Sequence, residues 1–250
     1  MRLIFVLEYD GSRFHGYQSQ PNHLTVQDCL EAALAKVLGV FTRTLAAGRT
    51  DCGVHALGQV VACDTEARIP LPAMECGLNA RLVGRGIRIR RTLRGPDDFH
   101  PRHHAIQRAY RYVMTEALPP SVFLAPYVTF LPKPLDWARV EAAAQFLQGA
   151  HNLISFTTRP IDAVRLERSV DSIVFSREGA FIHADFTARS FLRGMIRNIM
   201  GWLIAIGEGR YPPETITDLL ATTVKDRAVE PAPPQGLYLV DVKYRPEVGL

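Results

Sequence analysis

Hydrophobic positions in the first part of the chain recur at two spacings, every second residue and every third or fourth, which predict strands and helices respectively. The clearest helical segment follows Thr25, where Val26, Leu30 and Leu34 fall on one face. Thr25 can cap the start of this helix, and Gly39 can end it. In chain order the pattern predicts a strand at 2–9, a helix at 25–38, strands at 42–48 and 57–64, a short helix at 70–79 and a strand at 87–93. This part of the chain therefore follows the order β-α-β-β-α-β.

The remainder of the chain repeats that order. The predicted elements are a strand at 106–116, a helix at 136–148, strands at 169–177 and 180–188, a helix at 190–206 and a strand at 238–244. Two such halves predict an α+β fold, with two ferredoxin-like or RRM-like halves whose antiparallel sheets flank a central basic cleft. The turn-rich residues 95–98 place the boundary, which gives domains 1–98 and 99–250.

Composition narrows the class of protein. Of the 250 residues, 47% are hydrophobic and 22% are charged, which excludes a disordered or low-complexity chain. No run of 18 apolar residues occurs, so we expect no membrane span, and the first eight residues resemble a strand more than a signal peptide. The four cysteines form no CxxC pair, which argues against disulfides and structural zinc. These features predict a cytoplasmic protein.

Positive charge is concentrated in residues 81–111. This stretch holds nine arginines and two aspartates, a local balance of +7 in a chain whose net charge is +4. The chain has 25 arginines and four lysines, and guanidinium groups bind phosphates bidentately and stack on bases. The stretch therefore favours a polyanionic partner, although an arginine-rich composition with a solvated basic face would give the same pattern.

Residues 48–59, with the sequence GRTDCGVHALGQ, form the densest unusual segment. Three glycines in eleven residues between two predicted strands indicate a tight loop that something approaches closely. Arg49, Asp51 and His55 supply polar chemistry within it. An ordinary turn in which Asp51 bonds its own backbone explains the same pattern. The composition of the loop alone leaves both interpretations open.

The same segment resembles the catalytic loop of the TruA family of tRNA pseudouridine synthases. Seven further segments resemble that family in the same order: 9–18, 25–27, 77–80, 99–102, 108–112, 191–198 and 236–239. The chain departs from the family pattern at Tyr17, where a tryptophan is usual, and at His103 and His104, where the family usually has Phe-Ser. Eight segments in register identify the chain as a member of the family.

The resemblance implies the isomerisation of uridine to pseudouridine at positions 38, 39 and 40, in the anticodon stem-loop of tRNA. The base is cut from C1′ at N1, turned, and rejoined through C5. The family needs no cofactor and no metal. Its members act as homodimers, with one tRNA spanning both subunits, so the expected partners are tRNA and a second copy of the chain.

The resemblance also assigns roles to residues of the active site. Asp51 matches the catalytic nucleophile, and Arg197 matches the cation that keeps this carboxylate ionised when it is withdrawn from water. Tyr110 matches the tyrosine that lies against the target base. Arg49 matches the arginine that holds the extruded nucleotide, since a base within a stem must be flipped out before it can react. A solvated helix arginine at 197, and a tyrosine at 110 or 112 that simply packs in the core, are the structural alternatives.

Six residues are expected to contact RNA. Phe99, His100 and Arg102 belong to a segment that matches a tRNA-contacting region and lies inside the basic stretch, where arginines can meet phosphates. The residues assigned to RNA binding are Arg49, Phe99, His100, Arg102, Arg108 and Arg165, the last with an uncertain alignment.

Two other classes of function compete with this interpretation. A non-catalytic RNA-binding protein with two RRM-like halves would explain the basic stretch but leaves the Asp51 segment without a purpose, and the aromatic-rich RNP1 pattern is missing. A metal-dependent hydrolase could use His100, His103 and His104, but carboxylates and cysteines at ligand spacing are absent from that region. Substitution of Asp51 discriminates between these classes.

Overall fold

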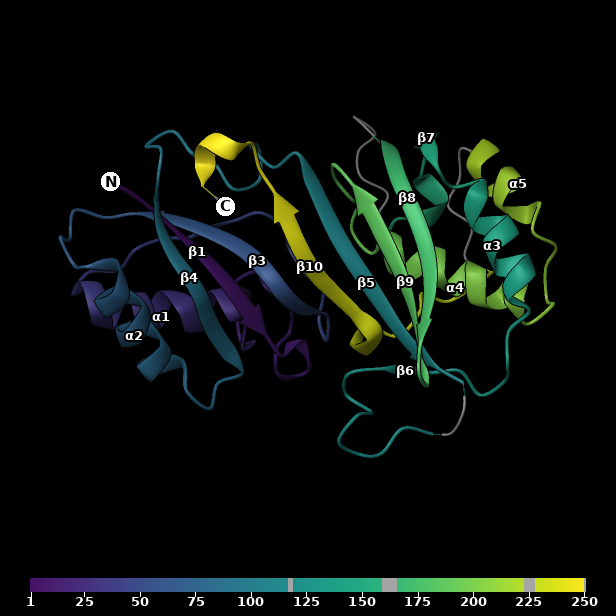
Figure 1. Ribbon diagram of the computed structural model, residues 1–250, viewed down its shortest axis with the longest axis horizontal. Helices are drawn as coiled ribbons and strands as arrows, with labels where there is room; N and C mark the ends of the chain where they lie inside the picture. The colour runs from purple at the N-terminus through teal and green to yellow at the C-terminus, as the bar shows by residue number, and fades with distance from the viewer. Residues whose placement is uncertain (117–118, 159–165, 223–227, 250) are drawn as a thin grey trace. The chain divides into compact units, whose positions relative to one another are not determined.

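The computed structural model describes residues 1–116, 119–158, 166–222 and 228–249. The chain folds into two compact units (Figure 1). The first unit comprises Met1–Arg108 and Tyr238–Leu250, and the second comprises Ala109–Leu237. Both units combine strands with helices, so the described residues form a mixed α+β protein, as the sequence predicts. They contain five α-helices, one more than expected, and mostly antiparallel strand pairs.

In the first unit, four strands lie in the order β4-β1-β3-β10. The elements are β1 (Arg2–Tyr9), η1 (Gly11–Arg13), α1 (Val26–Leu38), β2 (Leu45–Ala46), β3 (His55–Asp64), α2 (Leu71–Leu82), β4 (Ile87–Gly95), β10 (Leu237–Lys243) and η4 (Pro246–Val248). β1 runs antiparallel to β3 and β4, and the short β2 pairs with β3. β10 runs parallel to β3, with Tyr238 opposite His55. The predicted order β-α-β-β-α-β is therefore confirmed for this part of the chain.

The core of the first unit lies between its strands and the two helices α1 and α2 (Figure 1). Phe5 and Leu7 on β1, Leu30 and Leu34 on α1, and Leu78 on α2 are all 0% exposed. The predicted ends of α1 are also confirmed. The Thr25 side chain accepts a hydrogen bond from the Asp28 amide at 3.2 Å, and Gly39 adopts a left-handed conformation.

The second unit has a sheet in the order β5-β9-β8-β7, with β6 paired to β5. Its elements are β5 (Gln107–Thr115), β6 (Thr129–Phe130), α3 (Trp137–Gln145), β7 (Gly149–Asn152), η2 (Ile154–Phe156), β8 (Glu167–Glu178), β9 (Phe181–Ala188), α4 (Met195–Gly207), α5 (Thr215–Ala221) and η3 (Pro234–Gly236). β8 and β9 form the predicted hairpin around Gly179, whose φ is +58°. None of the helices in the described parts of the chain is long and apolar enough to cross a membrane.

The second unit is not a simple copy of the first. β6, β7 and α5 have no counterpart among the predicted elements, and the helix predicted to begin at 190 begins at Met195. Gly194, with a φ of +69°, occupies the N-cap position of α4 and separates the preceding turn from the helix. The last predicted strand, β10, is counted with the first unit because it pairs with β3.

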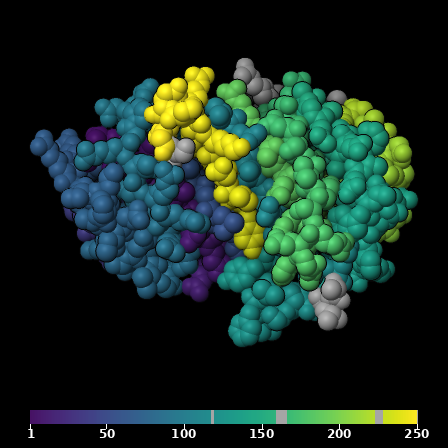
Figure 2. Space-filling model, viewed as in Figure 1, coloured from purple at the N-terminus to yellow at the C-terminus, as the bar shows by residue number. Residues whose placement is uncertain are grey.

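The observed division of the chain therefore differs from the single boundary expected near residue 98. The chain passes from the first unit to the second at Arg108, and its C-terminal segment returns to the first unit. Figure 2 shows this segment in yellow on the surface of the viewed face. Phe99 explains why the chain stays in the first unit beyond residue 98. Its ring is 0% exposed and packs edge-on against Tyr244 of the first unit, with the ring centres 5.1 Å apart. The basic cleft expected between the halves stays a prediction.

Candidate active site

The Asp51 loop, residues 47–54, connects β2 to β3 and is braced by two buried polar side chains. Gln59, which is 0% exposed, donates from Nε2 to the Gly48 carbonyl at 2.8 Å and accepts from the Gly48 amide at 3.3 Å. The Tyr9 hydroxyl lies 2.8 Å from Thr50 Oγ1, within hydrogen-bonding distance. Buried polar groups are stable only when their hydrogen bonds are made, so these contacts fix the start of the loop.

Residues 14–17, named the Gly16 segment, follow β1 and form a close cradle for the same loop. The Tyr17 amide donates to the Thr50 carbonyl at 3.1 Å, and the Gly53 amide donates to the Phe14 carbonyl at 3.4 Å. Gly16 has a φ of +93°, and a Cβ atom there would lie 2.8 Å from the Thr50 carbonyl oxygen. Only glycine combines this backbone conformation with such a close approach. Two of the segments that carry the family resemblance therefore act together as one structural unit.

Asp51 opens a tight turn within the loop. The Val54 amide donates to the Asp51 carbonyl at 3.1 Å, and Gly53 at the third position of the turn has a φ of +79°. This is the glycine position of a type II turn. Asp51 itself is partly exposed, and its neighbours Arg49 and Cys52 are exposed. The turn thus holds a carboxylate near the surface on a backbone that is fixed from both sides.

His55 anchors the exit of the loop. Its ring is 2% exposed and stacks on Tyr238 of β10, with ring centres 4.7 Å apart. His55 Nδ1 accepts a hydrogen bond from the Gly11 amide at 3.0 Å. A ring nitrogen in that role carries no proton, so the sequence signal at His55 is explained by a structural contact.

Tyr110 and Arg197 lie in the second unit, on β5 and α4. Tyr110 is 8% exposed, and its ring meets Phe191 edge-on with centres 5.1 Å apart. Arg197 is partly exposed and donates from Nε to the Ala232 carbonyl at 2.8 Å. The Ala232 amide donates back to the Arg197 carbonyl at 2.8 Å. These reciprocal bonds fix the position of Arg197 on α4.

Tyr112, two residues beyond Tyr110 on the same face of β5, has a structural role. It is 0% exposed, and its hydroxyl donates to the Pro233 carbonyl and lies 2.7 Å from Thr129 Oγ1. Burial raises the pKa of this hydroxyl, against the opposing influences of Thr129 and the Arg197 charge. Tyr112 therefore packs in the core, as the structural alternative expected, and Tyr110, at 8% exposed, is buried as well.

The residues assigned to RNA differ in accessibility. Arg49 and Arg102 are exposed and His100 is partly exposed. Phe99 and Arg108 are 0% and 6% exposed, so neither side chain presents a surface to a large ligand in this conformation. Arg165 lies outside the described residues.

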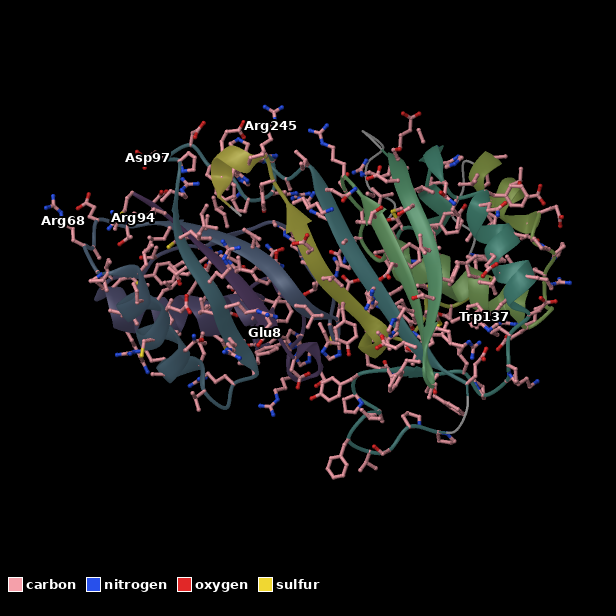
Figure 3. All side chains as sticks on the ribbon, viewed as in Figure 1. Glu8, Arg68, Arg94, Asp97, Trp137 and Arg245 are labelled. Carbon is pink, nitrogen blue, oxygen red and sulfur yellow. The ribbon has the colours of Figure 1, made fainter. Side chains whose placement is uncertain are left out.

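Several arginines of the basic stretch already have protein partners. On β4, Arg88 and Arg90 approach Glu8 of β1 at 3.8 and 3.0 Å (Figure 3). Arg111 forms a bidentate pair with Asp185, with distances of 2.7 and 2.9 Å. The charge that the stretch offers to a polyanion is therefore smaller than the sequence count of +7 suggests.

Two of the three histidines near residue 100, His100 and His104, accept backbone hydrogen bonds with their ring nitrogens. His100 Nδ1 accepts from the amides of Arg102 and His103 at 3.1 and 3.4 Å, and His104 Nδ1 accepts from the His100 amide at 3.3 Å. Within the described residues, no three His, Cys, Asp or Glu side chains are grouped to hold a metal ion. The geometry of this cluster therefore does not support the hydrolase alternative.

Two residues that hold the Asp51 loop in place, Tyr9 and Gln59, were given no individual role in the sequence analysis. Both lie at buried positions of strands and point polar atoms at the Asp51 loop. The available signal was a glutamine at an otherwise apolar position of the 57–64 strand, since a buried amide requires a partner nearby.

Known proteins resemble the chain over its whole length. A family model described as tRNA pseudouridine synthase matches residues 6–103 and 143–245. A protein of Methylobacillus flagellatus named tRNA pseudouridine synthase A is 40% identical over 247 residues, covering 98% of this chain and 93% of that protein. A protein of the same name from Pseudoalteromonas atlantica is 40% identical, and the alignment covers 98% of this chain and 92% of that protein. Another from Legionella pneumophila is 36% identical, and the alignment covers 100% of this chain and 95% of that protein. A solved structure titled "Crystal Structure of a Cbf5-Nop10-Gar1 Complex" aligns with 80% of this chain and 54% of that chain. Its TM-score of 0.32 at 11% identity is too low to support any inference about this chain. The chain therefore belongs to the tRNA pseudouridine synthase family.

Proposed function

We propose that this protein isomerises uridine to pseudouridine at positions 38, 39 and 40 of tRNA, with Asp51 as the nucleophile and without a cofactor. The observation that carries the proposal is the bracing of the Asp51 loop by Gln59, Tyr9 and the Gly16 segment. Such bracing is needed when a carboxylate must meet a reacting atom in a fixed geometry. The names of the full-length relatives support tRNA uridine as the substrate.

The reaction conserves the atoms of the nucleotide. The ionised Asp51 attacks the nucleotide, the bond between N1 and C1′ breaks, and the base turns before C5 bonds to C1′. The bond between Asp51 and the nucleotide then breaks, which returns the free carboxylate. A proton leaves C5 and N1 gains one, so the product is an isomer and needs no oxidant or reductant. We assign to Arg197, from its match to the family, the role of favouring the ionised form of Asp51, because a cation opposes the effect of desolvation on a carboxylate.

Two other side chains complete the proposed site. The target base stacks on the Tyr110 ring once tRNA binding exposes this side chain, which is 8% exposed in the free protein, and the Tyr110 hydroxyl assists proton transfer at C5. Arg49, exposed two residues before Asp51, occupies the space that the flipped nucleotide leaves in the stem. Arg102 and His100 contact the tRNA backbone, which positions the stem-loop without reading its sequence. The protein acts as a homodimer in the cytoplasm.

The test is isomerisation of an unmodified tRNA that carries uridines at all three positions, in EDTA and without cofactor. Pseudouridine is mapped by carbodiimide treatment and primer extension. Asp51→Asn removes the charge with little change in shape, and we expect turnover to fall roughly 10⁴-fold or more while tRNA binding is kept. Asp97→Asn is the matched control, because Asp97 is an exposed aspartate of the first unit and should leave turnover unchanged (Figure 3).

The outcomes separate the candidate functions. Pseudouridine at positions 38–40 with Asp51 intact, and its loss only in Asp51→Asn, supports the proposal. Tight tRNA binding without product in the wild-type protein favours the non-catalytic RNA-binding protein. Activity that requires a divalent metal contradicts a cofactor-free mechanism.

A further inference from the structure

The His100 turn, residues 99–104, connects β4 to β5 and has an unusually well-anchored backbone. Four consecutive carbonyl groups accept hydrogen bonds. Their donors are Arg2 Nη1 for Phe99, the His104 amide at 3.0 Å for His100, the Tyr244 hydroxyl at 2.7 Å for Pro101, and Arg108 Nη2 at 3.0 Å for Arg102. Three of these donors come from side chains distant in sequence from the turn or beyond its end. The shape of the turn is therefore imposed by the first unit as a whole.

The amide groups of the turn are held as well. His100 Nδ1 accepts from the amides of Arg102 and His103, and His104 Nδ1 accepts from the amide of His100. Partial burial, together with His103, lowers the pKa of His100, so its ring is neutral at pH 7 and Nδ1 stays an acceptor. The side chains of Arg102, His103 and His104 are nevertheless exposed. The turn thus presents exposed polar side chains on a fixed backbone.

Arg108 connects this turn to the Asp51 loop. Its guanidinium donates from Nε and Nη2 to the Ala47 carbonyl at 3.3 and 2.7 Å, and from Nη2 to the Arg102 carbonyl at 3.0 Å. Ala47 is the first residue of the Asp51 loop, and its amide donates to the Val60 carbonyl of β3 at 2.8 Å. One planar group therefore joins the two loops, and its fixed fork sets their separation.

The burial of Arg108 argues against direct contact with RNA. The side chain is 6% exposed, and a buried cation is tolerated only when its donors are satisfied. Contact with a phosphate would require this buried guanidinium to become exposed, although its Nε and Nη2 donors are already bonded to the carbonyls of both loops. The adjacent Tyr244 is similarly enclosed, since burial raises the pKa of its hydroxyl against the opposing charge of Arg108.

We propose that Arg108 is a positioning residue that fixes the Asp51 loop relative to the tRNA-contacting His100 turn, and that it does not itself bind tRNA. This inference rests on the proposed function, which supplies the roles of Asp51 and Arg102. It replaces the expectation that Arg108 contacts RNA. When tRNA phosphates engage Arg102, the Arg108 bridge keeps the carboxylate of Asp51 at a fixed offset from the bound backbone.

The test compares two arginine-to-lysine variants. Arg108→Lys keeps the charge but has no fork, so one ammonium cannot reproduce both bridges. We expect kcat to fall about 10- to 100-fold, as a displacement of about 1 Å can cause, with the tRNA dissociation constant and its salt dependence unchanged. Arg68→Lys is the matched control, since Arg68 is an exposed arginine of the first unit outside the basic stretch, and it should keep kcat and the salt dependence.

Hydrogen exchange and side-chain NMR supply readouts that do not depend on activity. Exchange should rise in both the Asp51 loop, residues 47–54, and the His100 turn, residues 99–104, of Arg108→Lys, and in neither segment of Arg68→Lys. In the wild-type protein labelled with ¹⁵N-arginine, the Arg108 Nε–H should exchange slowly and should not shift when tRNA binds. This measurement holds even if the variant fails to fold.

Three results would overturn the inference. They are a wild-type kcat in Arg108→Lys, a loss of affinity and of salt dependence in that variant, or an Arg108 Nε–H that exchanges rapidly and shifts with tRNA. Failure of the proposed function is a separate outcome, recognised because the wild-type protein then makes no pseudouridine while exchange and NMR still report on the bridge.

Discussion

Phe99 and Arg102 lie three residues apart in one turn, yet one side chain is buried and the other is exposed. Phe99 is 0% exposed against Tyr244, whereas Arg102 is exposed on a backbone whose carbonyl is held by Arg108. Both belong to the segment whose resemblance to the family implies contact with tRNA. A motif alone therefore does not separate a residue that touches RNA from one that shapes the segment, whereas burial does.

The buried position of Phe99 predicts a large effect on stability. Phe99→Ala leaves a cavity in the core of the first unit and should lower its free energy of unfolding by about 3–5 kcal/mol. The measurement is hydrogen-exchange protection of the β1 and β3 amides. Phe123→Ala is the matched control, because Phe123 is 83% exposed and its truncation should change stability by less than about 0.5 kcal/mol. Equal effects of the two substitutions would contradict the assignment of Phe99 to the core.

The exposed position of Arg102 predicts an electrostatic effect without a structural one. Arg102→Ala should weaken tRNA binding and lower the slope of log affinity against log salt by about 0.7–0.9, the loss of one phosphate contact. Binding is measured at several salt concentrations. Arg68→Ala is the control, since Arg68 is exposed in the same unit but lies outside the basic stretch (Figure 3). An unchanged slope for Arg102→Ala would remove this residue from the tRNA interface.

At the scale of elements, the Asp51 loop depends on a cradle that is far away in sequence. The Gly16 segment approaches Thr50 more closely than any side chain allows, and Tyr9 and Gln59 bond the loop from β1 and β3. These contacts form only when β1 and β3 pair. The precision of the candidate site is therefore a property of the sheet and not of the loop sequence alone.

Gly16→Ala tests this dependence. The new methyl group would stand 2.8 Å from the Thr50 carbonyl oxygen, so the Asp51 loop must shift, and we expect kcat to fall at least about tenfold. Gly84→Ala is the matched control, because Gly84 has a comparable φ of +73° but open space around it. Both variants carry backbone strain of about 1–2 kcal/mol, and only Gly16→Ala should lose turnover. A similar kcat in the two variants would mean that the cradle does not position Asp51.

Elements whose shape depends on near neighbours could be predicted from the sequence. The Thr25 cap and the hairpin around Gly179 have the predicted form, since each needs only contacts within a few residues. The start of α4 was wrong by five residues because the positive φ of Gly194 keeps the preceding turn out of the helix. The Arg108 bridge was not predicted, because a guanidinium 61 residues from Ala47 shows no sequence signal of burial. The basic count suggested RNA contact instead.

At the scale of the whole molecule, the chain completes its first unit with its last strand. β10 pairs with β3 across a sequence separation that no local pattern encodes, and Gly58 of β3 leaves room for the backbone of Val240. Tyr244, just after β10, then reaches the carbonyl of Pro101 in the His100 turn. The proposed tRNA-contacting turn near the middle of the chain is thus supported by the C-terminal residues.

Removal of those residues should therefore loosen the first unit selectively. A chain ending at residue 237 loses the buried side chains of Leu239, Val242 and Tyr244, which are 0%, 4% and 6% exposed. At about 2–5 kcal/mol for each large buried side chain, the loss is comparable with the stability of a domain, so amides of β1 and β3 should lose their protection from hydrogen exchange.

A chain ending at residue 245 keeps all three side chains and should retain protection. Amides of α3 and α4 should stay protected in both proteins, because these helices pack within the second unit. Equal loss of protection in the two units would show that they unfold as one, and full protection of β3 in the shorter chain would show that β10 does not stabilise the first unit.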